Sequence, residues 1–288
     1  MLRALLSVLL SCCAIGALTA ADLVPTVSDY RVAAFFLANG EALPELRLHY
    51  RTLGAPTHDE TGLITNAVLL LHGADQTGDD FLSHGFADVM FEPGAPLDTQ
   101  RYFMIVPDDL GSGESSKPSD GLHARFPSYS AMDAVDVQYR LVLDHLAVNH
   151  LRLILGNTTG CTEAWLWGRL HPYFADALIA IDCLASQPQL IADATADSAK
   201  ANAADDAAYR RQALAMTQSA PGLQVVRSEV VAIMSEATLN AERRAILERD
   251  IARVKNGRYA IVDTKSGAFA EPEKWRVILP ELLEKTEH

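Results

Sequence analysis

Apolar runs alternate with amphipathic stretches along most of this chain. The continuous apolar runs at 66–71 and 102–106 are typical of strands buried on both faces of a sheet, and residues 151–155 read as a further buried strand. Between Ser130 and Leu146 the apolar residues recur at the spacing of a helix. Strands that alternate with helices predict a mostly parallel sheet covered by helices on both faces. The predicted strands are 31–37 and 46–54, which form an antiparallel hairpin, and 66–71, 102–106, 151–155, 177–181, 230–234 and 259–262; the predicted helices are 130–146, 161–170, 241–254 and 274–284.

One stretch, 185–221, interrupts this alternation. It is rich in alanine and aspartate and contains few large apolar residues. Such a composition predicts loose helices lying over the sheet rather than a second hydrophobic core. We therefore expect a single domain over residues 22–288 with a thin lid at 185–221.

The N-terminus has the pattern of an export signal. Arg3 precedes an uncharged apolar stretch that ends in the small residues Thr19, Ala20 and Ala21, and Asp22 follows at once. This pattern predicts a signal peptide over residues 1–21 and a secreted or periplasmic protein. A membrane anchor is the alternative, but a short run rich in serine, glycine and alanine spans a bilayer poorly, so no stable membrane span is expected. The string that ends at Cys12 leaves lipidation there as a further alternative.

Charge and cysteine content narrow the classes of partner. A formal net charge of −13 repels phosphate backbones, so nucleic-acid binding is not expected. Without residues 1–21 the remaining cysteines are Cys161 and Cys183. A disulfide between them is one alternative, and two small buried thiols are the favoured one. No C-x-x-C or H-x-x-x-H spacing is present, so no metal or other cofactor is expected. The oligomeric state stays open.

Candidate chemistry lies directly after the predicted strand at 151–155. There the chain reads Gly156-Asn157-Thr158-Thr159-Gly160 and continues into a predicted helix. A strand that turns sharply into a helix between two glycines is the context of a nucleophile elbow, which exposes one hydroxyl above a parallel sheet. Thr158 takes the place of the usual serine, so it is the candidate nucleophile.

An ordered series of motifs surrounds this elbow. From about residue 43 to residue 184 the chain resembles the homoserine O-acetyltransferase branch of the α/β-hydrolase superfamily. The strings that carry the resemblance are LRLHYRTLG (46–54), LLHG (70–73), SSKPSDGL (115–122), ARFP (124–127), QYRL (138–141), LRLILG (151–156) and AWLWG (164–168).

The resemblance implies an eight-stranded α/β-hydrolase sheet and acyl chemistry through a Ser–His–Asp triad. The nucleophile position of the family falls on Thr158. The oxyanion hole would consist of the backbone N–H groups of Thr159 and Ala74. The implied ligand is a small acyl ester or a similar molecule.

The histidine of the family has no counterpart at its expected position. After Thr158 the chain contains only His171, at the end of a predicted helix and expected at the surface, and His288, at the end of the sequence. In relatives the histidine lies in a Gly-His-Gly turn after the last strand. The matching segment here, 266–269, is Ser-Gly-Ala-Phe and offers no base.

The acid of the family is also missing from its usual place. In relatives it follows the strand that corresponds to 230–234. The direct match here is Ala237 or Thr238, and Glu236 would serve only with a shift of one residue. Other polar residues receive structural interpretations: support of the oxyanion loop for His72, an exposed loop for His123, packing for Cys161, and turn formation for Asp108, Asp109 and Glu114.

These departures lead to three hypotheses about function. The first is an exported α/β-hydrolase-like protein with lost or weak triad catalysis and a binding role. The second is an active ester hydrolase or acyltransferase that uses Thr158 as its nucleophile. The third is a decayed product without a selected activity. Homoserine acetylation itself is not expected, because export would separate the chain from cytoplasmic acetyl-CoA.

Overall fold

The computed structural model describes residues 24–186 and 222–286. The predicted signal peptide and nearly all of the predicted lid lie outside the described residues. Among the helices of the two described segments, none has the length and hydrophobicity needed to cross a bilayer.

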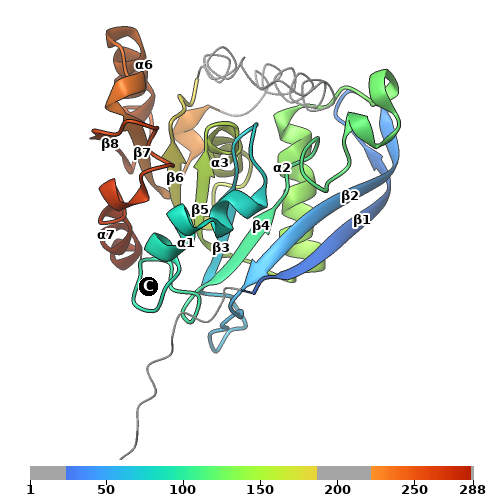
Figure 1. The fold of residues 1–288 in the computed structure, drawn as a ribbon, viewed down its shortest axis with the longest axis horizontal. Coiled ribbons are helices and arrows are strands. Elements are labelled where there is room, and N and C mark those ends of the chain that lie inside the picture. The colour runs from blue at the N-terminus through green and yellow to red at the C-terminus, as the bar shows by residue number, and fades with distance from the viewer. Residues whose placement is uncertain (1–23, 187–221, 287–288) are drawn as a thin grey trace, which may run out of the picture.

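The core of the molecule is one sheet of eight strands in the order β1-β2-β4-β3-β5-β6-β7-β8 (Figure 1). The β1–β2 and β2–β4 pairs are antiparallel, and all other pairs are parallel. This arrangement confirms the predicted α/β-hydrolase sheet and its opening hairpin. The strands are β1 Thr26–Phe36, β2 Ala42–Leu53, β3 Ala67–Leu71, β4 Phe103–Pro107, β5 Leu151–Asn157, β6 Ala175–Ile181, β7 Glu229–Ser235 and β8 Gly257–Val262.

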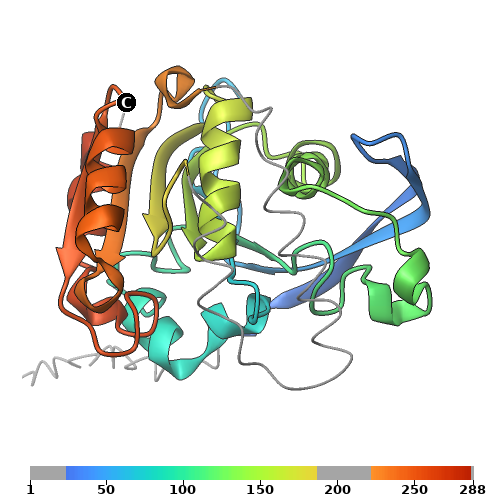
Figure 2. The ribbon, with the colours of Figure 1, turned by 90° about the horizontal axis from the view of Figure 1, so that it is seen from above.

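Helices cover both faces of this sheet. Their bounds are α1 His84–Met90, α2 Ala131–Arg140, α3 Thr159–Leu170, α6 Ala241–Ile251 and α7 Ile278–Lys285. Buried residues of α2, α3 and α6 belong to one hydrophobic cluster, and those of α1 and α7 to a second. Figure 2 shows α3 and α1 on opposite sides of the sheet. Because every residue of β3, β4 and β5 is buried, the central strands need the largely apolar sequences that predicted them; Arg152 and Asn157 of β5 are the polar exceptions.

The helix predicted over 130–146 is present in two parts. Ser130 is the N-cap of α2 and forms a capping box with Asp133, as the sequence indicates. After Arg140 the helix widens into a π-helical turn, Leu141–His145. The short helical segment at 78–90, which contains α1, was not predicted, because it is only a few turns long and lacks a sustained apolar period.

The loop after β4 is held by a buried charge. Asp108 is fully buried and accepts hydrogen bonds from Arg51 Nη1, Gly78 N–H and Glu114 N–H at 2.8, 2.8 and 2.9 Å. These contacts agree with the structural role predicted for Asp108. They attach the loop to β2, through Arg51, and to the segment that follows β3, through Gly78.

Candidate functional site

The strand-to-helix turn at Thr158 has the strained geometry of an elbow. Thr158 has φ +47° and ψ −103°, a conformation that is rare for a β-branched residue. The turn is also very tight. A Cβ on Gly156 would lie 2.1 Å from the carbonyl oxygen of Gly160, and a Cβ on Gly160 would lie 2.2 Å from that of Leu71. Gly156 is therefore required for the tightness of the turn itself, and Gly160 for its close approach to the end of β3.

A cavity of about 540 Å³ lies above the elbow. Thr158 is partly buried at its base, and its Oγ1 lies against Gly73, where an added Cβ would be only 2.3 Å away. The lining combines the elbow with the loop after β3, the end of β6, the segment after β7 and the loop after β8. Its residues are Gly73, Ala74, Asp75, Gln76, Asn157, Thr158, Asp182, Ala237, Thr238, Arg243, Lys265, Ser266, Gly267, Phe269 and Ala270.

A glutamine connects the loop after β3 to the elbow, the two segments predicted to supply the oxyanion hole. Gln76 Oε1 accepts hydrogen bonds from the N–H of Gly73 at 2.9 Å and from Nδ2 of Asn157 at 2.8 Å. The loop that carries Ala74 is thus tied to the elbow through one side chain. Sequence reasoning missed this contact, because nothing in the local pattern at residue 76 indicates a partner at residue 157. The donor roles of Ala74 and Thr159 stay predictions.

His72 supports the same loop rather than facing the cavity. Its Nε2 accepts a hydrogen bond from the N–H of Asp109 at 3.0 Å, so Nδ1 carries the proton and donates to the carbonyl of Gly73 at 2.7 Å. The ring is buried. This arrangement agrees with the structural interpretation of His72 and leaves it no role as a base at Thr158.

Known proteins resemble this chain in sequence over about half of its length. A probable acyltransferase of Methanothermobacter thermautotrophicus is 30% identical over 155 residues, which are 54% of this chain and 47% of that protein. The homoserine O-acetyltransferase of Corynebacterium diphtheriae is 30% identical over 57% of this chain and 45% of its own length. The homoserine O-succinyltransferase of Leptothrix cholodnii is 34% identical over 54% and 43%. The chain thus spans about half the length of the curated relatives it matches. No protein-family model matches it.

Solved structures resemble it over nearly the whole chain. An acetylester hydrolase from Corynebacterium glutamicum superposes with a TM-score of 0.69 at 14% identity, covering 91% of this chain and 96% of that one. The homoserine O-acetyltransferase of Bacillus anthracis superposes with a TM-score of 0.68 at 16% identity, covering 90% and 98%. This chain has the α/β-hydrolase fold and is similar in sequence to homoserine O-acetyltransferases.

The protein lacks an imidazole in the described part of its cavity wall. Ser266 and Gly267, which belong to the segment that the family resemblance matches to the histidine turn, line the cavity. His123 is exposed in a short 3₁₀ turn and does not line the cavity, as predicted for a loop histidine. His171 caps the far end of α3 and stacks on Tyr139 with ring centroids 3.9 Å apart. It is half-buried rather than at the surface as predicted, and burial lowers the pKa of its ring.

A carboxylate that the sequence analysis did not select lines the cavity. Asp182 follows β6, and its Oδ1 and Oδ2 accept hydrogen bonds from the N–H groups of Ser235 and Ala268, both at 2.8 Å. Burial raises the pKa of Asp182, although these two hydrogen bonds and the charge of Arg243 oppose the shift. By contrast Glu236, the substitute considered from sequence, is exposed and does not line the cavity. The available signal was an aspartate directly after a buried strand.

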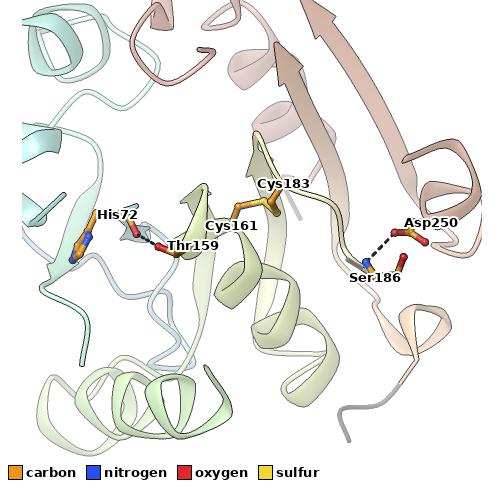
Figure 3. The surroundings of a disulfide bond; sticks show 6 residues. All are labelled: His72, Thr159, Cys161, Cys183, Ser186 and Asp250. Atoms are coloured by element: carbon orange, nitrogen blue, oxygen red, sulfur yellow. Dashed lines mark hydrogen bonds between the residues drawn. A yellow bond between two sulfur atoms is a disulfide. The ribbon is translucent and has the colours of Figure 1, made fainter. Parts of the chain in front are cut away.

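A disulfide joins the elbow helix to the segment after β6. Cys161, in the first turn of α3, is bonded to Cys183, and the two Cα atoms are 6.0 Å apart (Figure 3). The preference for two free thiols was therefore wrong. The pairing depends on the neighbouring positions of β5 and β6, which bring the start of α3 close to the segment after β6 although 22 residues separate the two cysteines. The bond connects the helix that follows Thr158 to the residue next to Asp182.

Removing this disulfide is expected to lower the stability of the protein. For a loop of this length, replacing both cysteines by alanine should lower the free energy of unfolding by about 2–4 kcal/mol. Urea unfolding of the oxidised wild type and of the Cys161→Ala, Cys183→Ala variant measures the difference. Dithiothreitol serves as the control, because it should destabilise the wild type and leave the double variant unchanged. Equal midpoints for the wild type with and without reductant would show that no disulfide forms.

Proposed function

We propose that this protein is an exported α/β-hydrolase-family member that binds a small acyl ester or a similar ligand above Thr158, with triad catalysis lost or weak. The observation that carries the proposal is the lining of the cavity, which in the described residues combines an elbow hydroxyl with no imidazole. A threonine hydroxyl without a base keeps its proton at neutral pH and is a poor nucleophile. Loss of triad members lowers kcat by roughly 10⁴- to 10⁶-fold in serine hydrolases.

The binding role is supported by what the cavity retains. Its volume suits a small molecule, and its wall includes the apolar residues Ala74, Phe269 and Ala270 beside polar groups at the elbow. Backbone donors do not depend on side-chain identity, so the replacement of serine by threonine does not by itself remove an oxyanion-type site for a carbonyl oxygen. A ligand carbonyl would then be held without being attacked.

Export is supported by two independent features. The first is the signal-like composition of residues 1–21, and the second is the Cys161–Cys183 disulfide, a bond that persists mainly in oxidising compartments. Mass spectrometry of the protein secreted by a bacterial host tests this part. The expected mature chain begins near Asp22, and a product that retains residues 1–21 in the cytoplasm would contradict it.

The alternative is an active ester hydrolase or acyltransferase that uses Thr158. One observation favours it: the partly buried carboxyl of Asp182, whose pKa is raised by burial, lines the same cavity as the elbow hydroxyl. Among the described residues, no hydrogen bond joins the carboxylate of Asp182 to the hydroxyl of Thr158. Nothing therefore makes the carboxylate a base for Thr158. We therefore give priority to the binding role.

Hydrolysis of 4-nitrophenyl acetate by the wild type and by Thr158→Ala and Thr158→Ser separates the two functions. Under the binding proposal the wild type and Thr158→Ala hydrolyse the ester at equal rates near the uncatalysed background. A wild-type rate ~10-fold or more above that of Thr158→Ala would establish a threonine nucleophile, because removal of a working nucleophile costs far more than tenfold. Thr158→Ser shows whether the methyl group alone limits the rate.

Binding is measured in the same proteins with 4-nitroacetophenone, a ketone that keeps the carbonyl and cannot be hydrolysed. Saturable binding in ligand-observed NMR is expected for the wild type. It should disappear in Ala237→Trp, which places a large ring in the cavity wall, and persist in Ala245→Trp, a matched change at an exposed position of α6 outside the wall. Equal binding by both variants would locate the ligand elsewhere.

A further inference from the structure

The carboxyl end of β6 brings a carboxylate to the elbow. The N–H of Thr158 donates a hydrogen bond to the carbonyl of Ile181 at 2.9 Å. Asp182, the next residue after Ile181, therefore lies beside Thr158. Asp182 and Thr158 then line the same cavity. Because β6 lies between β5 and β7 in the sheet, its end is closer to the elbow in strand order than the end of β7 is.

The side chain of Asp182 is oriented by two fixed donors. The N–H of Ser235, at the end of β7, holds Oδ1, and the N–H of Ala268, in the loop after β8, holds Oδ2. Each carboxylate oxygen has about two acceptor sites, so one hydrogen bond on each leaves capacity for another donor. The carboxylate is therefore held in place without being saturated.

Asp182 also faces the wall where relatives carry their histidine. A Cβ on Gly267 would lie 3.4 Å from Asp182 Oδ2, which is van der Waals contact. A larger side chain at position 266 or 267 that extended into the cavity would therefore contact the carboxylate of Asp182. Ser266, the neighbouring residue, is exposed and lines the cavity, so it has room for a larger side chain.

The backbone at Asp182 has a left-handed conformation. Its φ is +57°, a value that few non-glycine residues adopt, although aspartate tolerates it better than most. Residues in such conformations are found at turns and cluster at active sites. The chain order Thr158, Asp182 and then the loop after β8 also matches the order nucleophile, acid, histidine of this fold.

We propose that Asp182 is the acid of this site, moved from the end of β7 to the end of β6. The inference rests on the proposed function, in which the imidazole is the missing part. With an imidazole on the Ser266–Gly267 wall, Asp182 would accept a hydrogen bond from its Nδ1–H, and Nε2 would face the elbow hydroxyl. Asp182 is thus a positioning residue, and Glu236 has no part in the site.

A repaired site would hydrolyse esters by a balanced two-step reaction. The elbow hydroxyl attacks the ester carbonyl while its proton passes to Nε2 of the imidazole, and that proton then leaves with the alcohol. Water attacks the acyl-enzyme, with its proton taken by the same nitrogen, which returns the proton to the elbow oxygen as the carboxylic acid departs. Asp182 stays ionised throughout and stabilises the imidazolium.

The test installs the missing groups as Thr158→Ser with Ser266→His, and separately as Thr158→Ser with Gly267→His. Hydrolysis of 4-nitrophenyl acetate should rise at least ~100-fold over Thr158→Ser alone in one of them, the usual contribution of a positioned general base. We expect the Ser266→His version to be the better one, since Gly267 has φ +91° and a side chain there is strained. Thermal unfolding checks that each variant is folded.

The identity of the acid is read from further changes in the better repaired variant. Adding Asp182→Asn should lower kcat ~100-fold or more with KM nearly unchanged, since a neutral amide fixes the wrong imidazole tautomer. Asp182→Glu should retain more of the gain than Asp182→Asn does, and Glu236→Gln should have no effect. A merely structural Asp182 would instead alter stability and KM alongside kcat.

Three results would overturn the inference: no gain in either repaired variant, a gain that survives Asp182→Asn, or a gain that is lost with Glu236→Gln. Failure of the proposed function appears in a different measurement, which is activity of the unrepaired wild type above that of Thr158→Ala. The two outcomes are therefore distinguishable.

Discussion

Replacing Gly160 by alanine is expected to lower the free energy of unfolding by about 3 kcal/mol or more. The added Cβ would lie 2.2 Å from the carbonyl oxygen of Leu71 and 2.7 Å from that of His72. Both contacts are with backbone atoms, at the end of a central strand and the loop that follows it, so no side-chain rotation can relieve them. The hydrogen bond from Gly160 N–H to His72 O, 3.1 Å long, would also be strained. Urea unfolding monitored by circular dichroism measures the loss.

Gly85→Ala is the matched control for this prediction. Gly85 lies in α1, and nothing is within 4 Å of the position where its Cβ would be placed. A glycine in a helix is less favourable than alanine by roughly 0.5–1 kcal/mol, so this variant should be as stable as the wild type or slightly more stable. If Gly160→Ala behaved like Gly85→Ala, the close approach of the elbow to β3 would be refuted.

Replacing Asp108 by asparagine is expected to cost about 3–5 kcal/mol at neutral pH, because it leaves the buried guanidinium of Arg51 without its buried partner. The amide can replace only part of the acceptor capacity that serves Gly78 and Glu114. The control is Asp79→Asn. Asp79 pairs with the same Arg51 at 2.6 Å but has an exposed side chain, so its loss should cost about 1 kcal/mol or less.

The stability difference at Asp108 should depend on pH in a defined direction. Burial alone would raise the pKa of Asp108, but the N–H groups of Glu114 and Gly78 and the charge of Arg51 outweigh it and hold the pKa below its ordinary value. A lowered folded-state pKa means that the carboxylate contributes its stability fully above the unfolded pKa of about 4 and loses it as pH falls through the folded value. The difference in free energy of unfolding between the wild type and Asp108→Asn should therefore become smaller as the pH falls. A difference that became larger below pH ~4 would contradict an ionised Asp108 in the folded protein.

Local patterns predicted most of the fold. The central strands were visible as apolar runs because burial on both faces removes most polar positions, and α2 was visible from the helical period of its apolar residues. The segment at 78–90 was missed, since its helices are short and acquire their stability from packing of Phe81 and Phe86 against residues distant in the sequence. The observed ends of helices and strands differ from the predicted ones by a few residues, because packing against distant residues also decides where an element ends.

The elbow was predictable and its neighbours were not. Two glycines, a hydroxyl and an apolar strand are contiguous from 151 to 160, so the sequence alone places Thr158 at the turn. Gln76, Asp182 and the loop after β8 reach the same cavity from three other parts of the chain. No local pattern at any of them indicates the others.

The sequence by itself determined the class of sheet, the position of the elbow and the absence of a histidine in the segment that the family resemblance matches to the histidine turn, because each of these depends on residues adjacent along the chain. Only the tertiary structure decided that Cys161 and Cys183 are bonded and that Asp182 faces the Ser266–Gly267 wall. These pairs depend on the register of parallel strands. That register aligns the ends of β5, β6 and β7, and residues far apart in the chain meet where the strands end.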